Sequence, residues 1–402
     1  AMLSLLAMVA CTTQVQAQSL NQLFYVSPTG SGEGGRSWKA AFTDLSKIRW
    51  DKVQPGDTIF IDGGKESITY KSPLQVGKSG TKAARISIRQ SAESGRDGNI
   101  IIRGPNVGIT IQNQSYVSVQ GTRSSGIIVE SCSDTGVSVY GNVSKGPSVS
   151  NLLENIEVRN CGRDDRPGAG ISFSGQQLTL NRVIAHDNYR SNVKALFPQS
   201  DDASGLLLKS CWIYNNKVTS DGVSLERGIN LAGPKVNLFD CILGPGLANG
   251  AKLDGLSALF ANGVLFINGR GSNLKAVGSN WIDLRNTTSF MTRLNSEGKS
   301  HSFIDAPGPS GRVAINSSVV YGGAVLLKPG RVGSGNTQFR TTGNTAAISD
   351  QMVDPRFSTN VGAYPNTVSN GTLINTDFAL SLGSPAAGTG ARITSVRQLL
   401  GN

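Results

Sequence analysis

A segment of seven or eight residues, rich in apolar side chains, returns every 27 to 30 residues and is the feature of this sequence that most limits its fold. Its clearest copies each begin with a leucine: Leu153-Glu-Asn-Ile-Glu-Val-Arg-Asn160, Leu180-Asn-Arg-Val-Ile-Ala-His-Asp187, Leu208-Lys-Ser-Cys-Trp-Ile-Tyr-Asn215 and Leu238-Phe-Asp-Cys-Ile-Leu-Gly244. This period is expected when each coil of a solenoid adds one strand to each of several parallel sheets. A β-sandwich also has many short strands, but its pattern does not normally repeat with this period.

A second set of short segments also repeats, and its apolar residues alternate with polar ones. The five copies are Gly170-Ile-Ser-Phe-Ser-Gly175, Asn192-Val-Lys-Ala-Leu196, Gly228-Ile-Asn-Leu-Ala-Gly233, Gly250-Ala-Lys-Leu-Asp-Gly255 and Asn273-Leu-Lys-Ala-Val-Gly278. Successive side chains of a strand point to opposite faces, and neighbouring strands lie ~4.8 Å apart. The pattern therefore predicts one outward-facing column, formed by the third residue of each copy: Ser172, Lys194, Asn230, Lys252 and Lys275.

Composition agrees with a chain of many strands and tight turns. The 402 residues include 49 glycines, and only 6% are aromatic, which is unusual for a helical protein. A net charge of +11 favours a polyanionic partner. The sequence has no run of Lys and Arg and no zinc-ligand spacing, so we expect an acidic polysaccharide rather than nucleic acid. A basic surface that serves only solubility is the alternative.

The first residues predict export. The apolar stretch from Met2 to Cys11 is too short to span a bilayer and resembles the core of an export signal. Cleavage before Cys11 would give a lipid-anchored protein, and cleavage after Ala17 a free one, so residues 1–17 are interpreted as an export or lipoprotein signal. The expected location is periplasmic, cell-surface or secreted. A core helix is the alternative reading of this stretch.

Both ends of the mature chain resemble secreted right-handed parallel β-helix proteins. At the N-terminus the resemblance rests on a strand in Phe24–Gly30, a helix of roughly ten residues around Trp38–Leu45 and a Pro-Gly turn before a second strand; at the C-terminus it rests on Asp354-Pro-Arg-Phe357 and Asp377–Gly390. We therefore predict an all-β, right-handed parallel β-helix solenoid with a short N-terminal capping helix. It would form a single, monomeric domain over residues 22–402, with a cap at 22–83, coils at 84–325 and an irregular segment at 326–402. This architecture serves lyases, hydrolases, epimerases, tailspikes and adhesins, so it does not fix the activity.

Around Lys252 the sequence resembles the family-nine pectate lyases, in which a lysine of a comparable Gly-x-Lys-Leu strand is the base. The resemblance implies that Lys252 removes the C5 proton of a uronate in a β-elimination. Neighbouring cations disfavour protonation of such a lysine, which suits it to act as a base. The other residues predicted to take part in catalysis are Lys194 and Arg190, and those predicted to bind substrate are Lys275, Asn230, Asp254, His186 and Arg285.

The family also uses a cluster of aspartates to bind calcium, and here this chain departs from the pattern. The coil next to Lys252 offers Asn230, and the loop pair Asp201 and Asp202 is the candidate calcium site. The widely spaced Cys132, Cys161, Cys211 and Cys241 contain no CxxC pair, so metal binding by them is not expected. Cys211 and Cys241 lie at equivalent places of the repeat and are interpreted as small stacked core side chains, with a disulfide left open. Besides a lyase, the alternatives are a non-catalytic polysaccharide-binding or adhesion protein, and a glycoside hydrolase or uronate epimerase.

Overall fold

The computed structural model describes the chain from residue 21 onward, with gaps. The described residues are 21–141, 146, 148–163, 168–196, 205–216, 221–226, 235–254, 257–267, 272–277, 280–290, 302–306, 312–321, 324–327, 337–339, 342–343, 351–352 and 384. Within them, no helix is both long and apolar enough to cross a membrane.

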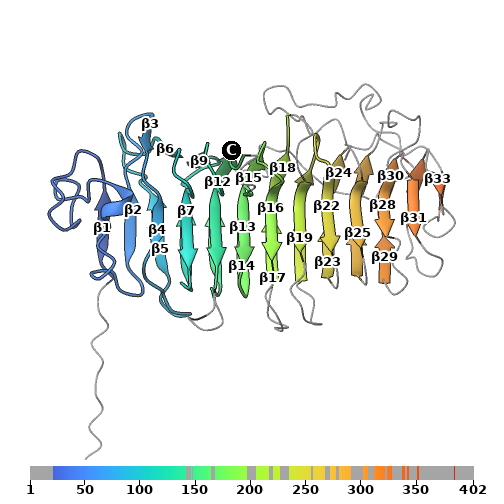
Figure 1. Ribbon diagram of the computed structural model, residues 1–402, viewed down its shortest axis with the longest axis horizontal. Coiled ribbons are helices and arrows are strands. Elements are labelled where there is room, and N and C mark those ends of the chain that lie inside the picture. The colour runs from blue at the N-terminus through green and yellow to red at the C-terminus, as the bar shows by residue number, and fades with distance from the viewer. Residues whose placement is uncertain are drawn as a thin grey trace, which may run out of the picture.

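Three parallel sheets run side by side along the long axis of the molecule (Figure 1). Sheet A consists of β1 (Leu23–Val26), β2 (Thr58–Ile61), β5 (Ile86–Gln90), β8 (Val117–Gln120), β11 (Asn151–Glu154), β14 (Gln177–Asn181), β17 (Gly205–Lys209), β20 (Lys235–Phe239), β23 (Ser257–Asn262), β26 (Asn280–Arg285) and β29 (Arg312–Asn316). Sheet B consists of β3 (Ser67–Tyr70), β6 (Asn99–Arg103), β9 (Ile127–Glu130), β12 (Ile156–Arg159), β15 (Ile184–His186), β18 (Trp212–Tyr214), β21 (Ile242–Leu243), β24 (Leu265–Ile267), β27 (Thr288–Phe290), β30 (Val319–Tyr321), β32 (Thr337–Phe339) and β34 (Gln351–Met352). Sheet C consists of β4 (Leu74–Val76), β7 (Ile109–Gln112), β10 (Val137–Tyr140), β13 (Ile171–Ser174), β16 (Ser191–Leu196), β19 (Asp221–Glu226), β22 (Asn249–Asp254), β25 (Ser272–Val277), β28 (Ser302–Ala306), β31 (Ala324–Leu327) and β33 (Thr342–Gly343).

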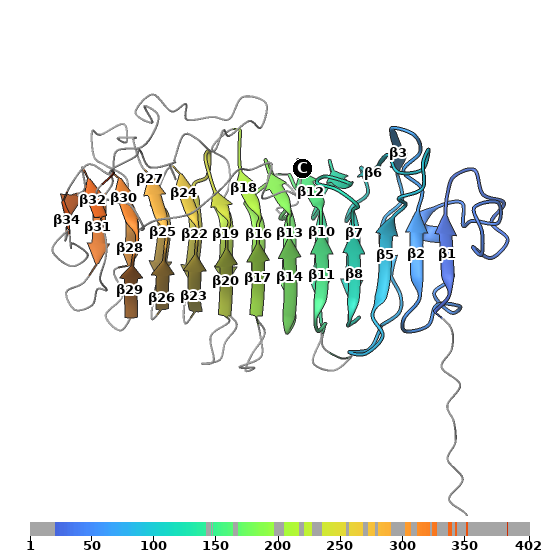
Figure 2. The same cartoon turned by 180° about the vertical axis from the view of Figure 1, so that it is seen from behind.

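From β2 to β31 the chain passes through sheet A, then sheet B, then sheet C, and each new coil adds a parallel strand to all three, as the reverse view also shows (Figure 2). Among the described residues, the last strands β32, β33 and β34 extend only sheets B and C. This arrangement is the predicted parallel β-helix. The ladders extend beyond the predicted coil region of 84–325, since β1 opens sheet A and β34 closes sheet B.

The repeated leucines form one interior column of sheet A. Leu153 pairs with Leu180, Leu180 with Leu208, and Leu208 with Leu238, and all four side chains are fully buried. The column continues through Ala261, Leu284 and Ile315. Stacking of like side chains along the axis is therefore the basis of the repeat, as predicted.

The bend from sheet A to sheet B uses one left-handed residue in each of seven consecutive coils. These residues have φ between 46° and 69°: Asn155, Arg182, Ser210, Asp240, Gly263, Asn286 and Ser317. Asn, Asp and Gly adopt this conformation at least cost. After the bend, a small residue points inward in six of these coils: Val183, Cys211, Cys241, Val264, Thr287 and Ser318. The cysteines predicted to be core side chains are in fact buried, and Cys132, Cys161, Cys211 and Cys241 are all free thiols.

Buried asparagines hold the corner between sheets B and C. Asn192 accepts hydrogen bonds from the backbone N–H and the side-chain amide of Asn188, at 3.2 and 2.9 Å. Asn192 also donates to the carbonyl oxygen of Tyr214 and to Oδ1 of Asn215, at 3.1 and 2.9 Å. The bonds from Asn192 to Tyr214 and Asn215 join neighbouring coils, so they fix the position of the corner between β15 and β16.

The predicted capping helix is wrong. The only helical element of the described residues near the N-terminus is the 3₁₀ turn η1 (Leu45–Lys47). Phe42 instead pairs with the free edge of β1, where its N–H donates to Tyr25 and its carbonyl accepts from Ser27. Trp38 packs edge-on against Tyr25, with ring centroids 4.6 Å apart. A segment of turns with one bridge residue, Phe42, therefore lies against the edge strand, and its bonds satisfy backbone groups of β1 that a helix would leave open.

Replacing Asn192 by alanine should lower the free energy of unfolding by about 3 kcal/mol, because it leaves several buried polar groups without a partner. Gln177→Ala is the matched control, since it removes an exposed amide that bonds Ser150 and should cost less than about 0.5 kcal/mol. Denaturant unfolding of the two variants measures the difference. Equal losses would show that the asparagine corner does not hold the coils.

Candidate functional site

Sheet C carries a column of lysines on its outward face. The register pairs Ser172 with Lys194, Lys194 with Ser224, Ser224 with Lys252, and Lys252 with Lys275. Lys252 and Lys275 therefore lie on adjacent strands, ~4.8 Å apart, with Lys194 two strands from Lys252. Five successive register positions hold three lysines and two serines, and the next position, on β28, is Asp305, in register with Lys275.

Strict alternation explains why the lysines point outward. Each is partly exposed, and both of its neighbours along the strand are buried: Val193 and Ala195, Ala251 and Leu253, Leu274 and Ala276. A slip of one residue would place the lysines inside the coil and the apolar side chains outside. The predicted outward column is therefore confirmed for these three lysines.

The prediction that Asn230 lies between Lys194 and Lys252 is wrong, because the register places Ser224 of β19 there. Asn230 itself lies outside the described residues. The segments around Ser224 and Asn230 show the same alternation of apolar and polar residues, six positions apart. Alternation alone cannot choose between two such segments.

The other predicted site residues are divided among several places. Arg190 is exposed at the bend between β15 and β16, four residues before Lys194. Asp254 ends β22, the strand of Lys252, and is in register with Val277. Arg285 lies on sheet A, where it forms a two-point ion pair with Asp283, so it is not part of the lysine column.

Asp201 and Asp202 lie outside the described residues. In the part of the chain that the structure describes, no group of three or more His, Cys, Asp or Glu side chains is placed to hold a metal ion.

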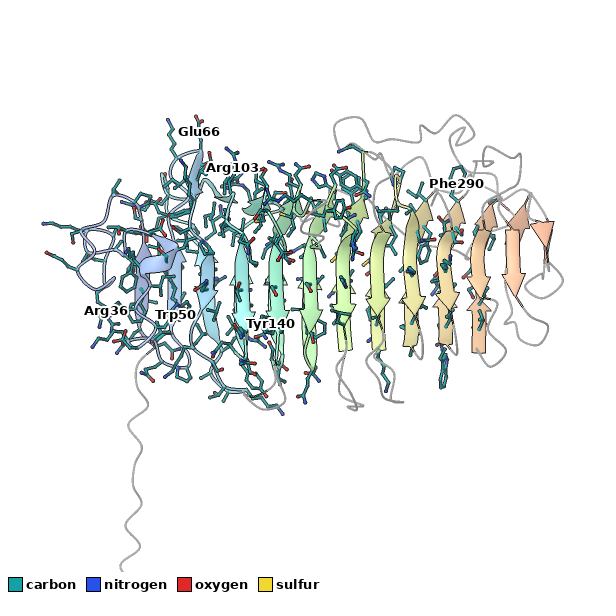
Figure 3. The ribbon with its side chains drawn as sticks, viewed as in Figure 1. Arg36, Trp50, Glu66, Arg103, Tyr140 and Phe290 are labelled. Atoms are coloured by element: carbon teal, nitrogen blue, oxygen red, sulfur yellow. The ribbon has the colours of Figure 1, made fainter. Side chains whose placement is uncertain are left out.

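His186 belongs to a second polar column, on the outward face of sheet B. Its members are in register on five successive strands: Arg103, Glu130, Arg159, His186 and Tyr214. Figure 3 labels Arg103 at the N-terminal end of this column. The carboxylate of Glu130 accepts from Arg103 and Arg159, at 2.5 and 2.7 Å. Its first three members, Arg103, Glu130 and Arg159, thus alternate in charge.

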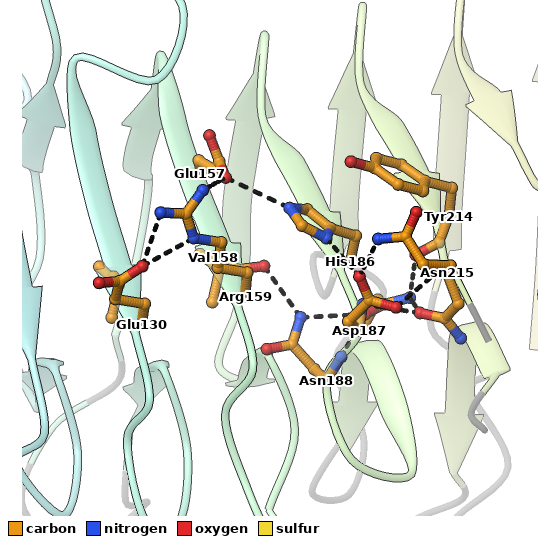
Figure 4. Close-up of polar contacts among 12 residues, drawn as sticks. Glu130, Glu157, Val158, Arg159, His186, Asp187, Asn188, Tyr214 and Asn215 are labelled. Atoms are coloured by element: carbon orange, nitrogen blue, oxygen red, sulfur yellow. Dashed lines mark hydrogen bonds and ion pairs between the residues drawn. The ribbon is translucent and has the colours of Figure 1, made fainter. Parts of the chain in front are cut away.

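The ring of His186 lies between two carboxylates (Figure 4). Its Nδ1 is 2.8 Å from Asp187 Oδ2 and its Nε2 is 3.2 Å from Glu157 Oε1. Arg159 also donates to Glu157, at 2.6 Å, and Asn216 donates to Asp187. His186 is only 8% exposed, so the network is shielded from solvent.

These contacts shift the pKa values of His186, Glu157 and Asp187. Burial alone would lower the pKa of His186, but the hydrogen bonds with Asp187 and Glu157 outweigh burial and raise it above the ordinary value. Burial would raise the pKa of Glu157, but the hydrogen bonds with His186 and Ser125 and the nearby charges of Arg159 and His186 together outweigh burial and lower the pKa to about 2. The pKa of Asp187 is lowered in the same way, against its burial. Each group stabilises the charged form of its neighbours.

Trp212 and Tyr214 lie on one face of sheet B. Their rings stack with centroids 4.2 Å apart, and Tyr214 stacks on His186 at 4.6 Å. Residues two apart in a strand share a face, so the sequence spacing itself carried this information. All three rings are buried, which makes them a packed support of the polar network rather than an open sugar platform.

Sequence reasoning missed Glu130, Glu157 and Arg159. Arg159, His186 and Tyr214 occupy the same seventh position in three copies of the repeated segment. This shared position could have indicated from the sequence that the three side chains lie in one column. Because arginine–carboxylate pairs neutralise this column internally, we regard the lysine column of sheet C as the better face for a polyanion.

No family model matches the sequence, and a search of curated proteins finds no match either. Among solved structures, the chain is similar to pectate lyase Pel9A, with a TM-score of 0.53 and 15% identity over 94% of this chain and 90% of that one. A rhamnogalacturonan lyase matches with a TM-score of 0.51 and 13% identity, over 84% and 91% of the two chains.

A mannuronic-acid-specific family-6 polysaccharide lyase from human gut microbiota matches with a TM-score of 0.51 and 14% identity, over 83% and 79% of the two chains. At these identities the likeness is one of fold. The comparisons therefore confirm the predicted parallel β-helix over most of the chain.

The His186 network predicts a particular dependence of stability on pH. The folded-state pKa of His186 is raised, so its contribution is complete below the unfolded pKa of about 6.5 and is lost as pH rises through the folded pKa. The pKa values of Glu157 and Asp187 are lowered, so their contributions are present above about pH 4.5 and are lost as pH falls through their folded pKa values.

His186→Gln should therefore lower the melting temperature most between about pH 4.5 and 6.5, with a difference from the parent that shrinks on either side. Thermal unfolding of both proteins from acid to mildly alkaline pH measures this. A difference that stays constant with pH would contradict the charged network.

Proposed function

We propose that this protein cleaves an acidic, uronate-containing polysaccharide by β-elimination, with Lys252 as the base. The observation that carries the proposal is the register of β22 and β25, which places Lys252 and Lys275 side by side on the outward face of sheet C. The fold shared with three polysaccharide lyases supports lyase activity over binding alone.

The direction of the lysine column suits a polymer. The column follows the stacking direction of the coils, so a chain laid along it meets cations at intervals of one or two strands. Lys194, on the N-terminal side of Lys252, and Arg190, at the bend before β16, would hold carboxylates of further sugar units. Binding by this face should weaken as salt rises.

In the reaction, the neutral amine of Lys252 takes the proton from C5 of a uronate. The C5–H electron pair forms the C4–C5 double bond, and the bond from C4 to the glycosidic oxygen breaks, so that oxygen leaves and takes up a proton. Lys275, as an ammonium, neutralises the charge that develops on the carboxylate.

A polymer of this kind is met outside the cytoplasm, which agrees with the export signal proposed for residues 1–17. Attachment of a lipid to Cys11, a monomeric state and use of calcium through Asp201 and Asp202 are further proposals. Chelation tests the last of these, since activity that is lost with EDTA and restored by added calcium would support it.

Replacing Lys252 by alanine should reduce turnover by about 10²-fold or more, because a positioned general base contributes about 10²–10⁴. Lys209→Ala is the matched control: Lys209 is an exposed lysine of sheet A and should keep full activity. The assay follows the ultraviolet absorbance of the unsaturated uronate on pectate, alginate and glycosaminoglycans, with and without calcium.

Retained activity in Lys252→Ala would refute the assignment of the base. If the parent protein produced no unsaturated product from any of these polymers, the lyase proposal itself would fall. Binding without turnover would then favour the adhesion alternative, and reducing ends without unsaturation would favour a hydrolase.

A further inference from the structure

Sheet A carries an aromatic side chain that packing inside the coil does not explain. Trp281 of β26 is 55% exposed. Among the described residues, the only other large hydrophobic side chain in this exposed class is Leu23, at the start of the same sheet. Trp281 lies on the outward face, since the next residue, Ile282, is fully buried.

A hollow of about 280 Å³ lies beside Trp281, over β20, β23 and β26. The register explains its shape. Lys235, Ala258 and Trp281 are paired across the three strands, so a methyl group stands between two long side chains. The next outward row is Asn237, Phe260 and Asp283, which closes one side of the hollow.

The wall of this hollow is held in place by contacts of its own. Arg285 bonds Asp283 at two points, 3.1 and 2.8 Å, and its guanidinium lies 5.4 Å from the ring centroid of Phe260. Phe239 packs against Phe260, with ring centroids 5.6 Å apart. The carboxylate of Asp283 therefore has a fixed direction, and it has further lone pairs with which to accept hydrogen bonds.

We propose that this hollow is a carbohydrate-binding subsite that stacks one pyranose unit of a polysaccharide on Trp281. The apolar C–H face of a pyranose matches an exposed indole ring, while its hydroxyl groups match acceptors and donors at the rim. Asp283 accepts, Asn237 both accepts and donates, and Lys235 donates. The volume is close to the lower end of the range for small-molecule sites, which suits a single sugar unit.

The charge of Lys235 determines which class of sugar, acidic or neutral, the hollow favours. It is an exposed ammonium at the edge of the hollow, whereas Asp283 is neutralised by Arg285, so the rim has a net positive charge that favours a uronate. This choice of an acidic polymer rests on the function proposed above, but the stacking on Trp281 does not. The subsite lies on sheet A and the lysine column on sheet C, so it would hold the polymer away from the reacting bond.

The test uses the full-length Lys252→Ala protein, which binds without turnover. Affinity electrophoresis in gels containing polygalacturonate, alginate or neutral galactan gives the dissociation constants. Adding Trp281→Ala should weaken binding to an acidic polymer by about tenfold, as expected for loss of one aromatic stacking contact and its buried area. The matched control is Leu23→Ala, which removes an exposed side chain at the far end of the same sheet and should leave binding unchanged.

Tryptophan fluorescence gives a second readout that a general loss of structure would not mimic. Polygalacturonate should shift the emission of the parent to shorter wavelength, and this shift should be absent in Trp281→Ala although both proteins have the same melting temperature. Lys235→Ala should reduce binding of polygalacturonate more than binding of neutral galactan.

Equal affinity of the parent and Trp281→Ala for every polymer would overturn the proposal, and so would a Trp281→Ala effect confined to self-association of the protein. The two proposals fail separately. If the protein cleaves a polymer but its binding does not depend on Trp281, only the subsite proposal is refuted. If binding depends on Trp281 but the protein cleaves nothing, only the lyase proposal is refuted.

Discussion

In-register stacking of parallel strands is the constraint on which the rest of this structure depends. The backbone bonds between coils fix which residues lie above one another, and alternation along each strand then decides which of them face solvent. Lys252 is outward because Ala251 and Leu253 are fully buried on either side of it. The same rule places Lys275 on the next strand and gives sheet C its basic face.

Coil length varies while the register stays constant. Along the interior column of sheet A, neighbouring members are separated by 27, 28, 30, 23, 23 and 31 residues from Leu153 to Ile315. The extra residues lie between strands, where lengthening a loop costs little free energy. Sheets A and C can therefore carry different outward side chains, a hollow walled by Trp281 on one and lysines on the other, without any change in the core.

Sequence patterns predicted what depends on repetition. The leucine column, the stacked cysteines and the outward lysines all follow from period and alternation, and the structure has them. The position of Ser224 was missed because two segments with the same alternation compete for one strand. The prediction of a capping helix was wrong because the pairing of Phe42 with the edge of β1 outweighs the local preference for a helix. The ring contacts of His186 depend on distances between coils, which spacing alone does not give.

The central claim is that an acidic polymer lies along sheet C over Lys252 and Lys275. A crystal structure of Lys252→Ala with a bound oligogalacturonate or oligomannuronate tests it most directly. The account predicts a uronate carboxylate about 3 Å from Nζ of Lys275, with C5 of that sugar facing the position of the missing amine. An oligosaccharide bound only at the His186 network of sheet B, with sheet C empty, would contradict it.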